Sequence, residues 1–206
     1  MSLFIMWLGV MFPLVASPGP ANIVFAASGA QVGVKRSIPL VAGVDMVFIM
    51  KSIIIGYGFG QVVHTYPNIM NILQALGAIY LVYLAVKFIR NSSNTSQNTQ
   101  KCLGFSDGLI IQALNSKGWL MIFLMFTLFT EQAQLVFNER GILVLVIWLA
   151  ILNISMHLAW VKAGELLAKI SNSNRYEKSL NIFYASCLLA VSGWLMVDNQ
   201  IWAQLV

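Results

Sequence analysis

Residues 3–27 read LFIMWLGVMFPLVASPGPANIVFAA. This run is long enough for a membrane-spanning helix, which needs about 20 mostly apolar residues. The segment Ser17-Pro18-Gly19-Pro20 interrupts it. Proline lacks the amide hydrogen that a helix uses and disfavours helical geometry in the residue before it. A continuous helix is therefore not expected, and the sequence predicts two half-helices separated by a break.

Five further apolar stretches of similar length follow along the chain. With the first, they predict about six transmembrane helices, at roughly 3–27, 38–60, 69–89, 106–130, 141–163 and 180–198. The runs are continuous and exceed the ~10 residues of a barrel strand, so the predicted fold class is an all-α integral membrane protein. We take the first segment as a retained helix because it lacks a basic leader; cleavage near Ala26-Ala27 is the alternative.

The composition also indicates a membrane protein. Of the 206 residues, 59% are hydrophobic and only 9% are charged, whereas soluble domains carry about 25% charged residues. The net charge of +5 does not indicate nucleic-acid binding, because the basic residues form no patch with interleaved aromatic residues. Cys102 and Cys187 belong to no metal-ligand pattern, so no metal site is predicted.

A polar linker divides the chain. Residues 91–100 read NSSNTSQNTQ and, with Lys101, separate the halves 1–90 and 102–206 of a single transporter domain. Each half holds three predicted spans, and an odd number makes the halves run in opposite directions through the bilayer. Inverted repeats of this kind are a common plan of transporters, with the binding site where the repeats meet at the midplane.

The basic residues predict the orientation of the helices. Nine of them follow the first, third and fifth spans, and one lies in the opposite set of loops. Because lysine and arginine collect in cytoplasmic loops, the loops after odd-numbered spans are predicted to be cytoplasmic and both termini external. The nine are Lys35, Arg36, Lys87, Arg90, Lys101, Lys162, Lys169, Arg175 and Lys178, and the one is Arg140.

The first span of the second half is also predicted to be broken. Residues 118–130 are apolar but too short to cross alone, so the polar segment before them, from Gln112 to Lys117, must enter the membrane. Ser17 and Asn115 are predicted to cap the N-termini of the resumed helices. Such N-termini attract anions, so the two ends with Lys117 predict a carboxylate site near the midplane. The alternative is an ordinary kink, with Lys117 reaching the membrane surface.

Four more polar residues lie inside the predicted spans. A charge at the centre of a span costs about 2.5–3.5 kcal/mol, so Asp45 and Lys51 are functional candidates, although six residues apart they do not share a face. Asp45 is a candidate for binding a substrate ammonium or carrying a proton, and a structural ion pair is the alternative. Asn153 and His157 are four residues apart and share a face. A satisfied packing residue is the alternative for His157.

The two broken segments and several short motifs along the chain resemble the opening and the middle of sequences of the lysine exporter (LysE/RhtB) amino-acid efflux family. The resemblance covers the whole chain, and its most specific part is the Pro-Gly-Pro block. This chain has Ser116 where the family has proline, and a charge at Lys51 that the family does not lead one to expect. The segments that carry it are Ser17-Pro18-Gly19-Pro20-Ala21-Asn22, Ser28-Gly29-Ala30, Gly33, Arg36-Ser37, Gly43, Gly77-Ala78-Ile79-Tyr80-Leu81, Gly108 and Leu114-Asn115-Ser116-Lys117.

The resemblance implies a multi-pass exporter of amino acids or close derivatives in a bacterial inner membrane, coupled to the proton gradient and without a bound cofactor. Its partners would be the amino acid and the lipid bilayer, and association of the chain with itself stays open. A membrane-embedded enzyme and a non-transporting partner subunit are the alternatives. The predicted substrate-binding residues, from the residue reasoning and the motifs together, are Ser17, Pro18, Gly19, Pro20, Asn22, Asp45, Asn115, Lys117, Asn153 and His157.

Overall fold

The structure, a computed structural model, describes residues 2–59, 67–93, 102–170 and 174–197. Within these ranges all regular elements are helical and no strand occurs, as predicted. The elements are α1 (Leu3–Ala16), α2 (Pro20–Ile54), the π-helical turn η1 (Ile55–Phe59), α4 (Pro67–Ser93), α5 (Phe105–Ala113), α6 (Ser116–Phe137), the 3₁₀ turn η2 (Asn138–Arg140), α7 (Gly141–Ile170) and α8 (Asn174–Val197). Helix α4 includes residues 91–93 of the predicted linker, and the rest of the linker lies outside the described residues.

Both predicted breaks are present. Helix α1 ends at Ala16 and α2 starts at Pro20, with extended backbone at Ser17 and Gly19 between them. Proline suits the first position of a helix, where its missing amide hydrogen leaves no bond unmade. In the second half, α5 ends at Ala113 and α6 begins at Ser116, after an extended Asn115. The polar segments identified in the sequence therefore do interrupt the helices.

A second feature of α2 marks the boundary between the first two spans. Gly33 has φ 77° and ψ 173°, a left-handed conformation that favours glycine, and it divides α2 into two helices. The Ser28 and Ser37 hydroxyl groups lie 2.8 Å apart. Nine residues of continuous helix would separate them by about 13.5 Å. The chain therefore reverses sharply at Gly33, within the predicted connection between the spans 3–27 and 38–60, and the two helices continue up to the turn.

Glycine pairs bring both parts of α2 against helices of the second half. A Cβ on Gly29 would overlap the Val161 carbonyl of α7, and one on Gly164 would overlap the Ala26 carbonyl. The second part of α2 meets α5 in the same reciprocal way, through Gly43 and Gly108. Glycine at such crossings allows backbones to approach closely, which suits helices packed in lipid. The two halves are thus interlocked through α2.

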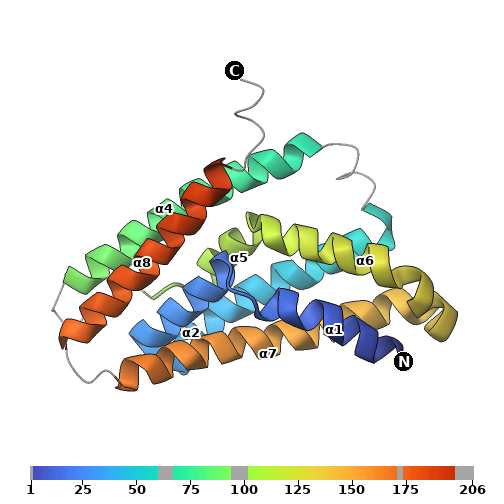
Figure 1. The fold of residues 1–206 in the computed structure, drawn as a ribbon, viewed down its shortest axis with the longest axis horizontal. Coiled ribbons are helices and arrows are strands. Elements are labelled where there is room, and N and C mark those ends of the chain that lie inside the picture. Colours follow the sequence, from blue (N-terminus) through green and yellow to red (C-terminus); the bar gives the residue numbers. More distant parts are fainter. Residues whose placement is uncertain (1, 60–66, 94–101, 171–173, 198–206) are drawn as a thin grey trace.

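The helices extend in opposite directions from the two breaks. Figure 1 shows α1 and α6 extending from the breaks toward one end of the bundle, and the first part of α2 extending toward the other. Helices α4 and α8 pack side by side in a layer next to the remaining helices (Figure 1). One buried cluster joins α1, α6 and the first half of α7 with Phe48 of α2 and Ile55 of η1, and another joins α2, α4, α5 and α8 with Val161 of α7. The breaks lie between these two clusters.

The outer faces of the helices are apolar. Ile79, Leu120, Ile151 and Phe183, on four different helices, expose between 57% and 62% of their surface. Contiguous exposed apolar surface is uncommon in soluble monomers and marks a membrane or partner surface. Two stretches, Pro20–Gly58 and Ser116–Ile170, are long and apolar enough to cross a membrane by length and composition, and three shorter helices are also apolar. The six-span inverted arrangement stays a prediction.

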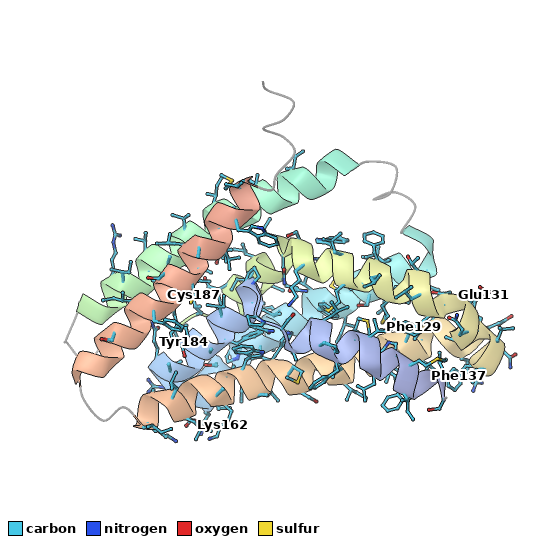
Figure 2. All side chains as sticks on the ribbon, viewed as in Figure 1. Phe129, Glu131, Phe137, Lys162, Tyr184 and Cys187 are labelled. Carbon is cyan, nitrogen blue, oxygen red and sulfur yellow. The ribbon has the colours of Figure 1, made fainter. Side chains whose placement is uncertain are left out.

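Charged residues mark the two ends of the bundle. Figure 2 shows Glu131 of α6 and Lys162 of α7 at opposite ends. Lys162 and Lys169 form ion pairs with Glu165, both at 2.8 Å, on an exposed face of α7. The orientation of these ends across a membrane stays a prediction.

Candidate functional site

The two breaks meet through Lys117. Its Nζ atom donates to the Ser17 carbonyl oxygen at 3.0 Å and to the Ser17 hydroxyl at 2.8 Å. Lys117 lies in the first turn of α6 and Ser17 at the end of α1, so this contact joins the two halves of the chain. A Cβ on Gly19 would lie 3.0 Å from Cδ of Lys117, so glycine leaves the space that the lysine stem occupies.

Side chains within each break hold its backbone in place. Asn22 donates through Nδ2 to the carbonyls of Val15 and Ser17, both at 3.0 Å. It thus supplies hydrogen bonds to carbonyl groups at the C-terminal end of α1 that have no partner within the helix. Asn115 accepts the Gly118 amide at 3.3 Å and caps α6, as predicted. The prediction that Ser17 caps α2 was wrong, because Ser17 is the C-cap of α1, and Gly19 precedes the first residue of α2.

The side chain of Lys51, a residue of α2, reaches the C-terminal end of α5. Its buried ammonium donates to the carbonyl oxygens of Gln112 and Ala113, the latter at 3.2 Å, and lies 4.2 Å from the Trp119 ring centroid. Helix C-termini carry partial negative charge, and an aromatic face also attracts a cation. These contacts compensate the buried charge that made Lys51 conspicuous in the sequence.

Asp45 pairs with His157 rather than with Lys51. The Asp45 carboxylate and the His157 Nδ1 atom lie 2.7 Å apart, and both side chains are buried. The Phe25 ring covers the imidazole at 4.5 Å between centroids. Because α2 and α7 come from different halves, this pair is a further polar link between them. Its geometry permits a proton to be shared or held between the two groups.

A small cavity of about 30 Å³ lies beside these contacts. This is room for one or two water molecules. Ser17 and Asp45 are not in its lining but bond to residues that are, and Pro18 is exposed and lies outside it. The cavity thus brings together most of the predicted residues from both halves. Those that line it are Gly19, Pro20, Asn22, Asn115, Lys117, Asn153 and His157.

Gln112 was not among the predicted site residues, yet it lines the same cavity. Its Oε1 atom accepts from Asn115 Nδ2 at 3.1 Å. Its buried Nε2 atom has no hydrogen-bond partner among the residues that the structure describes. A buried amide donor without a partner is costly and points to a water or a ligand. The signal in the sequence was a glutamine at the end of an apolar run, three residues before Asn115.

The arrangement can bind an anion and a cation close together. Lys117, the Gln112 amide and the first amide groups of α6 supply hydrogen-bond donors. Asp45 with His157 supplies a buried acid–base pair next to the same cavity. A zwitterion, with one carboxylate and one ammonium, matches this combination.

Comparison with known protein families gives one match over most of the chain. The family model described as LysE type translocator matches residues 12–199, which include both breaks and every residue of the candidate site. Comparisons with curated proteins and with solved structures gave no match. The matching family is a family of transporters rather than enzymes, and together with the apolar helices it indicates a membrane protein. The chain belongs to the LysE type translocator family.

Proposed function

We propose that the chain is a secondary transporter that exports amino acids, or close derivatives, from the cytoplasm. The observation that carries the proposal is the contact between Lys117 and Ser17, which makes one site of two broken helices. Non-helical backbone at membrane depth is tolerated where it lines a cavity, and broken helices surround the binding sites of many secondary transporters. Family membership supports the same function.

In this proposal Lys117 and Gln112 hold the substrate carboxylate. The ammonium of Lys117 exchanges one of its bonds to Ser17 for a bond to the carboxylate, and the unpartnered Gln112 Nε2 group adds another donor. The amide groups at the start of α6 contribute positive potential. Gln112, Lys117 and Gly118 all line the cavity, so these donors can act on one carboxylate.

The Asp45–His157 pair is proposed to couple transport to the proton gradient. The pair is buried, lies next to the cavity and joins helices of the two halves. Protonation of Asp45 would remove its charge and weaken its attraction to His157 and to a substrate ammonium. Proton binding and substrate release would then favour the same rearrangement of the two halves.

Transport on this scheme requires the helices to move. The cavity holds only water-sized molecules, so an amino acid enters only after the walls separate. Lys117 is a suitable gate, because its side chain lies across the cavity between the two breaks and its bonds to Ser17 can break and re-form. Alternating access in inverted-repeat transporters needs such a movement of one half against the other.

Uptake into inverted membrane vesicles tests the proposal. Vesicles that contain the protein should accumulate at least one of the labelled common amino acids when a proton gradient is imposed, and a protonophore should abolish the accumulation. Vesicles without the protein provide the control. Failure to accumulate any amino acid would contradict the proposed function, and accumulation that is indifferent to the protonophore would contradict the coupling.

The proposed location is a bacterial inner membrane, with the linker in the cytoplasm and η2 outside. Single cysteines at Ser96 and at Asn138, in a chain whose native cysteines are replaced, should react oppositely with an impermeant thiol reagent. The prediction rests on the nine basic residues in the loops after odd-numbered spans, compared with one in the opposite set of loops. Labelling of the Ser96→Cys variant from outside intact cells would reverse the orientation.

A further inference from the structure

A second cavity lies on the other side of the breaks. It shares Pro20 and Asn115 with the first, so these two residues separate the cavities. Its volume is about 20 Å³. Apart from the shared residues and Ser116, its lining comes from the facing sides of α4 and α5 and the residue after α5: Gly77, Tyr80, Leu81, Ile111 and Leu114.

The second cavity differs from the first in its chemistry. Aliphatic side chains and an aromatic ring make up most of its wall, and none of the lining residues that the structure describes is a carboxylate, lysine, arginine or histidine. The Tyr80 hydroxyl already donates to Asp107 at 3.1 Å. A charged group that entered this cavity would lose its hydration and find no opposite charge in the wall, which is strongly unfavourable.

Two lysines lie next to residues of the cavity wall. Lys51 binds the carbonyls of Gln112 and Ala113, directly before Leu114. Lys117 follows Ser116 directly in the chain. Both lysines are held by carbonyl groups, Lys51 at the end of α5 and Lys117 at Ser17. A cationic side chain is therefore opposed by desolvation, and neither lysine offers it an opposite charge.

We propose that the second cavity receives the side chain of the exported amino acid, and that the substrates are neutral amino acids with aliphatic side chains rather than lysine or arginine. This inference rests on the proposed function and adds the substrate class. With the carboxylate held by Lys117 in the first cavity, the α-carbon lies near Pro20 and Asn115, and the side chain extends past them. Both cavities widen together when the breaks separate.

Competition against counterflow of labelled leucine, in liposomes reconstituted with the full chain, tests the proposal. Alanine, 2-aminobutyrate and norvaline differ by one methylene each, and each methylene buried should improve apparent affinity about fourfold. Lysine should compete at least a hundredfold more weakly than norvaline. Lysine that competes as well as norvaline, or a series without dependence on side-chain length, would overturn the proposal.

Two variants of the cavity test the location of the side chain. Ile111→Phe fills the cavity and should weaken leucine and norvaline at least tenfold while leaving alanine within threefold. Leu81→Ala enlarges it and should shift the preference toward phenylalanine, and this variant decides the matter if Ile111→Phe does not fold. Leu84→Ala, one turn further along α4, is the matched control, since Leu84 is buried but lines neither cavity.

The outcomes separate this inference from the proposed function. If no amino acid, neutral or basic, shows counterflow, the proposed function itself has failed. If amino acids are exchanged but Leu81→Ala and Leu84→Ala alter the order of substrates alike, the export function stands and the second cavity is not the side-chain site. A shift of preference in Leu81→Ala alone supports the assignment.

Discussion

Replacing Lys117 with methionine tests the role of the lysine most sharply. Methionine keeps an apolar side chain of similar length and removes the ammonium group. In the structure this group makes two hydrogen bonds to Ser17, one of them at 2.8 Å. When a substrate is bound, we expect one of these bonds to be replaced by a bond to the carboxylate. The variant therefore loses the interaction with the substrate but keeps the rest of the cavity.

The expected loss of affinity follows from the charge of both partners. A hydrogen bond between charged groups contributes about 1.5–3 kcal/mol, and about 1.4 kcal/mol corresponds to a factor of ten. Binding of an amino acid to Lys117→Met should therefore weaken roughly tenfold to a hundredfold. The corresponding amino-acid amide lacks the carboxylate, so its binding should change less than threefold. Competition with the same labelled amino acid measures both ligands on one preparation.

Lys162→Met provides the matched control. Lys162 is exposed, pairs only with Glu165 in the part of the chain that the structure describes, and lies at an end of the bundle (Figure 2). The same substitution there should leave both affinities within twofold. Equal weakening of acid and amide in Lys117→Met would show that the lysine shapes the protein without binding the carboxylate. An equal effect of Lys162→Met would show that only overall charge matters.

Three further variants address the rest of the site. Asp45→Asn should abolish accumulation driven by the proton gradient but retain counterflow, which needs no gradient. Glu165→Gln is the control and should retain both activities. Gradient-driven accumulation by Asp45→Asn would show that the Asp45–His157 pair does not couple transport to protons. Lys51→Met removes the charged donor that binds two carbonyl groups at the end of α5, so the free energy of unfolding should fall by about 1–3 kcal/mol. An unchanged unfolding temperature would contradict this account of Lys51. Ser116→Pro should keep or raise the transport rate, since Ser116 is the first residue of α6 and proline suits that position. A variant that folds but does not transport would contradict this prediction.

The sequence predicted the breaks because their cause is local. Prolines at positions 18 and 20 prevent a continuous helix wherever the segment lies in the fold. The cap at Asn115 could be predicted for the same reason, since a short polar side chain binds an amide within its own turn. Ser17 shows the limit of such reasoning. The same hydroxyl can serve the end of one helix or the start of the next, and the structure places it at the end of α1.

The partners of the buried polar residues could not be predicted. Periodicity correctly indicated that Asp45 and Lys51 point to different neighbours, but it could not say which helices those neighbours belong to. His157 is 112 residues from Asp45, and Lys117 is 100 residues from Ser17. Such contacts depend on how the two halves pack. A connection between residues 27 and 38 was predicted, but the turn at Gly33 was not, because a single glycine gives no turn signal inside a helical pattern.

The central claim is that the two breaks form one binding site. It can be tested with single cysteines at Ser17 and at Ser116, one at each break, in a chain whose native cysteines are replaced. The rate of thiol alkylation is measured over a range of concentrations of an amino acid that the vesicles accumulate. The account predicts that this amino acid slows the reaction at both positions with the same half-maximal concentration. Protection at one break alone, or at two clearly different concentrations, would contradict it.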